Sequence, residues 1–302
     1  MSASILVVGS SNTDMVVNTS ELPGPGQTVL GGTFFMNPGG KGANQAVAAA
    51  RLGGRVAFVA KVGGDIFGAQ AIGQLKKEGI DCQYMITDSS AASGVALITV
   101  DQRGENCIVV APGANAGLNS GDVLAAQAAI LRADIILVQL EIPLETVERL
   151  VEFASAAGKR VILNPAPARP LPDQLLRQLL MITPNEKEAE LLTGVVVDGP
   201  DTALQAARVL SARGVPIVIV TLGRHGALVW DGQVASHLVP PPVVAVDTTA
   251  AGDVFNGALA VGLGEGMGLA DAVGFANRAA AVSVTRMGAQ GSAPGREEVG
   301  VG

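Results

Sequence analysis

Short apolar runs alternate along most of the chain with longer stretches whose apolar residues recur at helical spacing. The apolar runs predict strands at Ile5–Gly9, Val56–Val62, Asp134–Leu140, Arg160–Asn164, Met181–Thr183 and Pro216–Leu222. The periodic stretches predict helices at Lys41–Leu52, Ile66–Glu78, Ser120–Leu131, Leu144–Ala157 and Ala203–Ala212. Such alternation is typical of parallel βαβ units, so we expect an α/β fold with a wound, mostly parallel central sheet and helices on both faces.

Two regions break this alternation, because their strands follow one another without a helix between them. The strands are expected at Asp14–Thr19, Thr28–Met36, Tyr84–Thr87, Gly94–Val100 and Glu105–Val110, with turn signals at Pro23–Gly26 and Asp101–Gly104. We expect them to form a small antiparallel sheet, made from insertions at about 14–38 and 84–112, that serves as a lid on a single domain spanning 1–302. The last residues, from Glu298, are expected to fray.

Composition narrows the classes of protein. Of 302 residues, 48% are hydrophobic and only 3% aromatic, which suits helices packed on a buried sheet. The net charge of −7, without a basic run, argues against nucleic-acid binding. Cys82 and Cys107 form no CxxC pair and are expected to be reduced and buried, and His225 and His237 lack the spacing of zinc ligands. With no membrane-length apolar run and no signal-peptide pattern, we expect a soluble cytoplasmic protein.

Neither of the two commonest nucleotide-binding motifs is present. No G-x-G-x-x-G follows a predicted strand, and Gly40-Lys41 is followed by Gly42 where a P-loop has Ser or Thr. A dinucleotide-dependent dehydrogenase and a Walker-type NTPase are therefore disfavoured. Open parallel sheets bind ligands beyond the carboxyl ends of their strands, which directs attention to the residues that follow each strand.

The strongest local signal is the segment DTTAAGD at Asp247–Asp253, which leads into a helix predicted from Val254 to Leu263. Small residues at a helix start leave backbone N–H groups free, and the helix dipole adds positive potential, so the segment predicts an anion site. Asp253 lies in the first turn, where a carboxylate could accept a hydroxyl proton while the N–H groups hold a phosphoryl group. The alternative is that Asp247 or Asp253 simply caps the helix.

Other polar residues follow predicted strands. The segment GGKGANQ at Gly39–Gln45 opens a helix, and its glycines allow a ligand to approach the backbone. Asn12 and Asp14 come after the first strand, and Glu141 follows the strand at Asp134–Leu140. Several short polar side chains converging on strand ends suit a polyhydroxylated ligand, although each one alone could be an ordinary turn or cap residue.

Together these segments resemble the ribokinase family of carbohydrate kinases over nearly the whole chain, from about Ile5 to Glu298. The matching segments, in the family's order, are GSSNTD at Gly9–Asp14, GGKGANQAVAAARLG at Gly39–Gly53, LEIPLE at Leu140–Glu145, LNPAPA at Leu163–Ala168, TPNEKEAELLTG at Thr183–Gly194, DTTAAGD at Asp247–Asp253 and TRMGAQGSAP at Thr285–Pro294. The resemblance implies a ribokinase-like fold and transfer of the ATP γ-phosphoryl group to the primary 5-hydroxyl of a sugar, D-ribose first, giving D-ribose 5-phosphate and ADP. It further implies Mg²⁺, activation by K⁺, and a homodimer formed through the lid sheet.

The resemblance also implies roles for individual residues. Asp253 would be the general base, beside an anion hole made by Ala250, Ala251 and Gly252. The sugar-contacting positions would be Asn12, Asp14, Gly40, Lys41, Asn44 and Glu141. The nucleotide positions would be Asn185, Thr221, Gly223, Gly226, Gly252 and Asn277, with Glu188 completing an NxxE motif linked to Mg²⁺ and phosphate. The K⁺ site would fall on Asp247, Thr249, Ser283, Arg286, Gly288 and Ser292, several of them through backbone carbonyls.

Two further points bear on this hypothesis. Many family members have Gly-Ala-Gly before the base, where this chain has Ala250-Ala251-Gly252. Nucleosides, fructose and other sugars remain alternative acceptors, because Phe34 and Phe35 in the lid and the nearby Tyr84 could stack a base. A sugar-sensing protein that has lost turnover is an alternative of another class, against which an intact anion-hole segment with Asp253 argues.

Overall fold

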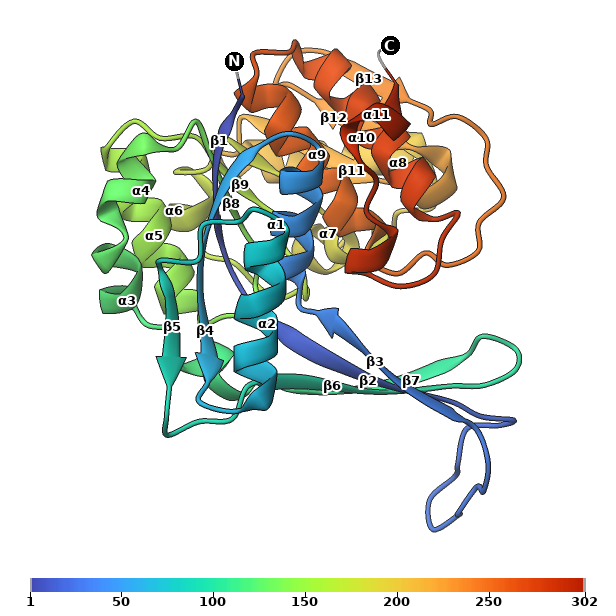
Figure 1. Cartoon of the computed structure of the whole chain (residues 1–302). Coiled ribbons are helices and arrows are strands. Elements are labelled where there is room, and N and C mark those ends of the chain that lie inside the picture. The colour runs from blue at the N-terminus through green and yellow to red at the C-terminus, as the bar shows by residue number, and fades with distance from the viewer. Residues whose placement is uncertain (1, 301–302) are drawn as a thin grey trace.

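The computed structural model describes residues 2–300 and shows helices on both faces of a nine-stranded sheet, with a four-stranded sheet projecting from one end (Figure 1). The order in the large sheet is β13-β12-β11-β10-β9-β8-β1-β4-β5. Neighbours from β5 to β11 pair in parallel, and only β12 and β13 add antiparallel pairs. The predicted wound, mostly parallel sheet is therefore confirmed.

The large sheet consists of β1 (Ser4–Val8), β4 (Arg55–Gly63), β5 (Met85–Asp88), β8 (Ile135–Val138), β9 (Val161–Leu163), β10 (Met181–Ile182), β11 (Ile217–Thr221), β12 (Ala227–Trp230) and β13 (Ala235–Leu238). The chain moves from β1 to β4 on one side and later to β8 on the other, so the strand order reverses at β1. Such a switch point in an open α/β sheet is where a ligand-binding crevice forms.

The helices form two layers. Residues of α3 (Ser120–Ala125), α4 (Gln127–Arg132), α5 (Leu144–Ala156), α6 (Asp173–Leu176), α7 (Glu186–Thr193) and α8 (Pro200–Ala212) share one apolar core with one face of the sheet. Residues of α1 (Lys41–Arg51), α2 (Ile66–Lys77), α9 (Ala251–Gly264), α10 (Leu269–Ser283) and α11 (Arg296–Val299) share a second core with the other face. Short 3₁₀ turns occur at η1 (Gly113–Gly117), η2 (Gly223–His225) and η3 (Gln290–Ser292).

The small sheet contains β2 (Asn12–Asn18), β3 (Thr33–Gly39), β6 (Gly94–Val100) and β7 (Asn106–Ala111), in the order β3-β2-β6-β7. Two expectations about it were wrong. The central pair, β2 with β6, is parallel, so the sheet is mixed rather than antiparallel. The strand expected at Tyr84–Thr87 is β5, which pairs with β4 at the edge of the large sheet, because the chain completes a βαβ unit through α2 before it enters the small sheet.

Other boundaries also differ from expectation. The helix predicted at Ser120–Leu131 is two short helices, α3 and α4, and α7 and α10 were not anticipated. Glu298 and Val299 belong to α11, and Val299 is buried, so fraying does not begin at Glu298. Cys82 is buried as expected, but Cys107 is exposed because its strand lies in the projecting sheet.

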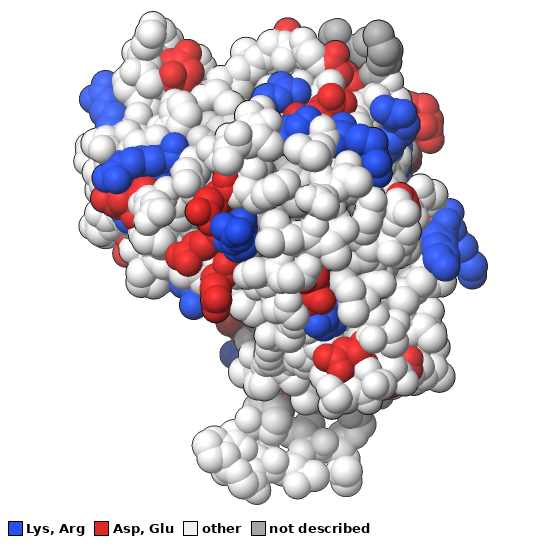
Figure 2. All heavy atoms as spheres, turned by 90° about the vertical axis from the view of Figure 1, so that its left-hand side faces the viewer, with Lys and Arg blue, Asp and Glu red and all other residues white. Residues whose placement is uncertain are grey.

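Charged side chains of both signs are interspersed over the face shown in Figure 2, with no continuous basic patch in that view. The part that projects at the bottom carries hardly any charge there. No helix within residues 2–300 is both long and apolar enough to cross a membrane.

Candidate active site

Asp253 lies at the interface between α1 and α9, two helices that pack unusually closely. A Cβ added at Gly257 would lie 2.8 Å from the Cβ of Ala48, so a larger residue would force the helices apart. This contact brings two amides of α1 onto the carboxylate. Asn44 Nδ2 donates to Asp253 Oδ2 at 2.9 Å, and Gln45 Nε2 donates to Oδ1 at 3.0 Å. Both carboxylate oxygens are thus fixed in a site where the side chain is only 5% exposed.

Buried side-chain amides that are hydrogen-bonded to one another hold this arrangement in place. Gln139 Nε2 donates to Gln45 Oε1, which orients the Gln45 amide so that its nitrogen faces Asp253. Gln45 Nε2 also donates to Asn164 Oδ1 at 3.0 Å, and Asn164 Nδ2 donates to the carbonyl of Thr183 at 3.1 Å. The network leaves two buried oxygens, Gln139 Oε1 and Asn44 Oδ1, without a partner among the described residues. Its hydrogen bonds nevertheless fix the orientation of Gln45, and a catalytic carboxylate requires such fixed partners.

The same network reaches the first turn of α9. The Thr183 hydroxyl donates to Asn256 Oδ1 at 2.6 Å, and Asn256 Nδ2 donates to the carbonyl of Gly252 at 2.8 Å. These supporting residues were not predicted from the sequence. A signal was available, because Gln139, Asn164 and Thr183 directly follow β8, β9 and β10, at the carboxyl edge of the sheet.

The start of α9 has free backbone donors. The N-cap is Ala250, in the left-handed conformation at φ 59° and without a side-chain cap, so neither Asp247 nor Asp253 caps the helix. Within residues 2–300 the N–H groups of Gly252 and Asp253 take no hydrogen-bond acceptor. Both residues line a pocket of about 170 Å³ together with Ala250 and Ala251. Free N–H groups at the positive end of a helix form a site for a phosphoryl group.

Lys41 is the positive charge of this pocket. Burial alone would lower the pKa of its ammonium, but Asp253, Glu141, Glu188 and Asp14 outweigh that effect and raise it. Lys41 therefore remains charged. Burial raises the pKa of Asp253, opposed by Lys41 and the two amides, and burial likewise raises the pKa of Glu188. A carboxyl group whose pKa is raised towards neutrality is suited to accept a proton.

The ends of β1 and β8 meet at the switch point. Ser10 Oγ donates to Glu141 Oε2 at 2.5 Å, and the backbone N–H of Lys41 donates to the same oxygen at 3.0 Å. A Cβ at Gly40 would lie 2.7 Å from the backbone nitrogen of Asn12, so the glycine at φ 89° allows this close approach. Glu141 and the GGKG turn are thus held against the segment that leads into β2.

Asn12 is oriented by a residue that the sequence analysis did not identify. Asn115 Nδ2 donates to Asn12 Oδ1 at 2.8 Å, and Asn115 Oδ1 accepts from the N–H of Ser11 at 3.0 Å. Because its oxygen is engaged, Asn12 presents its NH₂ group to a ligand. Asn115 is buried in η1, which returns the chain from the small sheet, and no pattern around it distinguished it from a turn residue.

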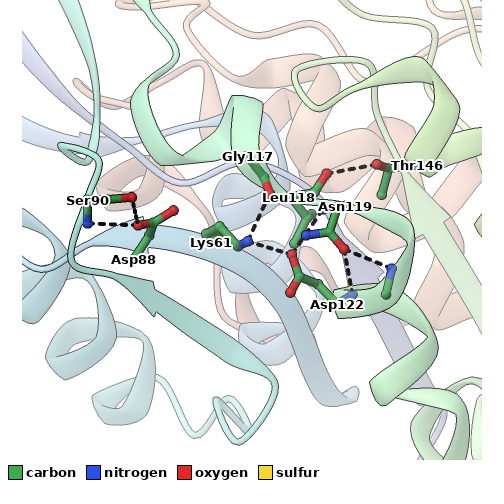
Figure 3. Close-up of polar contacts among 9 residues, drawn as sticks. Lys61, Asp88, Ser90, Gly117, Leu118, Asn119, Asp122 and Thr146 are labelled. Carbon is green, nitrogen blue, oxygen red and sulfur yellow. Dashed lines mark hydrogen bonds and ion pairs between the residues drawn. The ribbon is translucent and has the colours of Figure 1, made fainter.

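A buried ion pair anchors η1 to the main body (Figure 3). Lys61 Nζ, from β4, donates to the carbonyl of Gly117 at 2.9 Å and lies 2.6 Å from Asp122 Oδ2 at the start of α3. Lys61 is only 8% exposed, so the pair is well shielded from water. It fixes the turn that carries Asn115.

A wide cleft separates the small sheet from the main body. Alternate residues of β2 and β3 line it, among them Asp14 and Phe35, and the loop around Asp247 forms the opposite wall. Burial, followed by the charges of Glu141 and Asp253, raises the pKa of Asp14 to about 6. Phe34 is on the other face of the strand, and Tyr84, which directly precedes β5, lies near Arg132, so of the three rings named as possible stacking surfaces only Phe35 lines the cleft.

The predicted nucleotide residues fall into two groups. Asn185 and Glu188 form the capping box of α7, where the N–H of Glu188 donates to Asn185 Oδ1 at 2.8 Å, and both line the pocket of Asp253 with Thr221. Gly223 is the first residue of η2 and Gly226 directly follows it, and Asn277 donates to the carbonyl of Leu238 at 2.9 Å. This second group lies beside β13, outside the residues that line the Asp253 pocket.

The predicted K⁺ residues are only partly brought together. Asp247 accepts hydrogen bonds from the N–H groups of Thr249 at 2.9 Å and Gly288 at 2.8 Å, which lower the pKa of its carboxyl despite burial and keep it ionised. Arg286 directs its guanidinium to Glu298. The hydroxyls of Ser283 and Ser292 donate to carbonyls within their own turns.

Comparisons with known proteins show the family of this chain. The profile of the pfkB family carbohydrate kinases matches residues 2–296. A ribokinase from Haemophilus influenzae is 43% identical over 298 residues, covering 99% of this chain and 97% of that protein. A deoxyribokinase from Salmonella typhi is 39% identical over 295 residues, covering 97% and 96%. The structure of an Arabidopsis thaliana ribokinase complexed with ribose and ATP superposes with a TM-score of 0.91 at 32% identity, covering 99% and 98%. The chain belongs to the pfkB family of carbohydrate kinases.

Proposed function

We propose that this protein transfers the γ-phosphoryl group of ATP to the primary 5-hydroxyl of D-ribose, giving D-ribose 5-phosphate and ADP. The observation that carries the proposal is the buried Asp253 at the start of α9, which lines one pocket together with the free backbone N–H groups and Lys41. Ribokinases that are about 40% identical over nearly the whole chain support the choice of reaction.

In this proposal the main body performs the chemistry. Asp253 accepts the proton of the attacking hydroxyl, and the two amides that hold its oxygens keep it aligned. The N–H groups of Gly252 and Asp253, with Lys41, stabilise the negative charge on the transferring group. The anion-hole positions Ala250, Ala251 and Gly252 contribute backbone rather than side chains, so the departure from Gly-Ala-Gly preserves the donors.

The small sheet would supply recognition. At neutral pH the carboxylate of Asp14 is ionised, and it can accept hydrogen bonds from two neighbouring hydroxyls, which ribose carries at C2 and C3 and 2-deoxyribose does not. Asn12, Gly40, Asn44 and Glu141 complete the sugar-binding set that the proposal assigns. Closure of the sheet over the cleft would exclude water from the phosphoryl group.

A panel of acceptors tests the substrate. ADP release should require an acceptor, and kcat/KM should be highest for D-ribose among ribose, 2-deoxyribose, fructose and adenosine. A higher kcat/KM for adenosine, fructose or 2-deoxyribose would overturn the choice of ribose while leaving the family assignment intact. No ADP release with any acceptor would instead support the sugar-sensing alternative, and release at the same rate with and without sugar would indicate ATP hydrolysis rather than transfer to a sugar.

Mg²⁺ and K⁺ are part of the proposal. Asn185 and Glu188 fit a Mg²⁺ that keeps phosphate and water ligands, since Glu188 faces the same pocket as Asp253 and supplies a carboxylate. Mg²⁺ would neutralise part of the negative charge of the phosphate groups there. The ionised Asp247 fits a K⁺ site completed by backbone carbonyls of the loops around Gly288 and Ser292. Equal rates in K⁺, Na⁺ and a bulky organic cation at matched ionic strength would argue against that site.

We further propose a cytoplasmic homodimer joined through the small sheet. Its outer face carries a row of exposed apolar side chains at Phe34, Met36, Leu97 and Val109 on three strands. The cross-strand register places Met36, Met15, Leu97 and Val109 side by side, opposite in direction to the residues that line the cleft. An exposed apolar face of this kind is typical of an interface. Sedimentation velocity should give twice the monomer mass, and Leu97→Asp should give a monomer.

A further inference from the structure

The first residue of β2 lies between two glycines on the neighbouring strands. In the register of the small sheet, Asn12 pairs with Gly39 of β3 on one side and with Gly94 of β6 on the other. Side chains directly opposite one another in a sheet point to the same face, and so does the side chain two residues further along the strand, here Asp14. The two glycines are therefore next to Asn12 and Asp14, two residues of the proposed sugar site.

The space that a side chain at Gly39 would take is occupied by the carboxylate of Asp14. A Cβ added at Gly39 would overlap both carboxylate oxygens and the Cγ of Asp14, and these are its three nearest atoms. Gly39 does not have a positive φ, so alanine would suit the backbone and the Asp14 carboxylate is the obstacle. Asp14 accepts no hydrogen bond from the described residues. Packing on the glycine, rather than a polar partner, therefore sets where this carboxylate lies.

Gly94 makes room in the same way for Asn12. A Cβ added at Gly94 would overlap Asn12 Oδ1 and Asn115 Nδ2, the two atoms joined by the hydrogen bond of 2.8 Å that orients Asn12. A side chain there would separate the two amides, and Asn12 would lose the partner that makes it present its NH₂ group to a ligand. Gly94 has no positive φ either, so the close approach of side chains, and not backbone conformation, requires glycine.

We propose that Gly39 and Gly94 are positioning residues that determine the selectivity of the sugar site. Each leaves the space that one recognising side chain needs, Asp14 next to Gly39 and Asn12 next to Gly94. Displacement of the Asp14 carboxylate would remove an acceptor for neighbouring hydroxyls of the sugar, while the amides that hold Asp253 on the main body would stay in place. The effect on selectivity rests on the proposed function, whereas the positions of the two side chains do not.

The first test is a double-mutant cycle between Gly39 and Asp14. Gly39→Ala should weaken ribose binding about tenfold and lower the preference for ribose over 2-deoxyribose, with little change in kcat at saturating ribose. In an Asp14→Ala background the three atoms nearest to the added Cβ are absent, so Gly39→Ala should leave the Kd for ribose unchanged. The control is Gly73→Ala on α2, where a Cβ meets no atom within 4 Å, and it should change neither affinity nor preference. An equal loss in both backgrounds would overturn the proposal, because Gly39 would then act without Asp14.

The second test applies the same cycle to Gly94. Gly94→Ala should weaken ribose binding in wild type but not in an Asn12→Ala background, because Asn115 acts on the sugar only through Asn12. A loss of the same size in both backgrounds would contradict the role of Gly94.

Crystal structures of the two alanine variants without ligands separate this proposal from the proposed function. In Gly39→Ala the Asp14 carboxylate should have moved away from residue 39, and in Gly94→Ala the hydrogen bond between Asn12 and Asn115 should be broken, with the strand register preserved. Side chains of Asp14 and Asn12 in their original places would overturn the proposal. Because no substrate is present, this outcome stands even if the ribose assay fails.

Discussion

Two carboxylates of the candidate site, Asp253 and Asp14, lie in surroundings that are built differently. On the main body, Asp253 is almost fully buried and receives hydrogen bonds from two amides, one of which, Gln45, is itself held by Gln139. On the small sheet, Asp14 accepts no hydrogen bond from the described residues, and its pKa is raised to about 6, by burial first. A residue that acts in the transition state is fixed before the substrate arrives, whereas a residue that recognises the substrate keeps its acceptors free.

The largest expected effect concerns Asp253. Asp253→Asn should lower kcat by about 10²–10⁴-fold, the usual contribution of a general base, with much smaller changes in the affinities for sugar and ATP. A variant that kept more than a tenth of wild-type kcat would show that Asp253 is not the base.

The burial of Asp253 also predicts that its replacement changes stability in a pH-dependent way, which would not be expected for an exposed carboxylate in the first turn. Because its pKa is raised in the folded state, the stability that protonated Asp253 contributes is present at low pH and is lost as pH rises through the folded pKa. The melting temperature of Asp253→Asn relative to wild type should therefore increase as pH rises. A difference that stayed constant between acidic and alkaline pH would contradict this electrostatic account.

The next prediction concerns the ion pair that anchors η1, where the chain returns from the small sheet to the main body. Lys61→Met should cost about 3–5 kcal/mol of unfolding free energy, because Asp122 is left without its partner. The KM for sugar should also rise, since η1 carries Asn115. The control is Arg149→Met, which breaks the exposed pair with Glu152 and should cost less than about 1 kcal/mol in urea unfolding. If the two variants lost the same unfolding free energy, Lys61 would not anchor η1 to the main body.

A smaller effect is expected at Asp14. Asp14→Asn should weaken sugar binding by about 1–3 kcal/mol, measured as Kd, with little change in kcat at saturating sugar. Its raised pKa means that the stability contributed by protonated Asp14 is lost between about pH 4 and pH 6. Asp14→Asn should accordingly gain stability over wild type as pH rises through this window. If kcat fell as steeply as for Asp253→Asn, the assignment of catalysis to the main body and of sugar recognition to the small sheet would be wrong.

The smallest effect is expected at Ala250. This residue holds a left-handed conformation that glycine adopts without strain, so Ala250→Gly should change the unfolding free energy by less than about 1 kcal/mol. The rate should stay within about twofold of wild type, because the backbone donors are unchanged. A large loss of kcat would mean that the Ala250 methyl group, and not only its backbone, shapes the anion site.

The sequence by itself predicted six of the nine strands of the central sheet, all but β5, β12 and β13, and it indicated DTTAAGD as the segment for catalysis. Periodicity separates strands from helices locally, and the small residues of DTTAAGD at a helix start have few other uses. It could not locate β5, because a short apolar strand is compatible with either sheet and only the βαβ connection through α2 decides between them. The parallel pairing of β2 with β6 could not be predicted either, because strand pairing depends on the path of the whole chain.

Only the tertiary structure decided how the site is supported. Gln139, Asn164 and Asn115 are separated along the chain from the residues they orient, and an isolated amide has no periodic signature. Burial of Asp253 and the raised pKa of Asp14 likewise depend on neighbours from distant segments. Local sequence specifies which groups are available for chemistry, whereas desolvation and hydrogen-bond geometry arise only when packing brings those groups together.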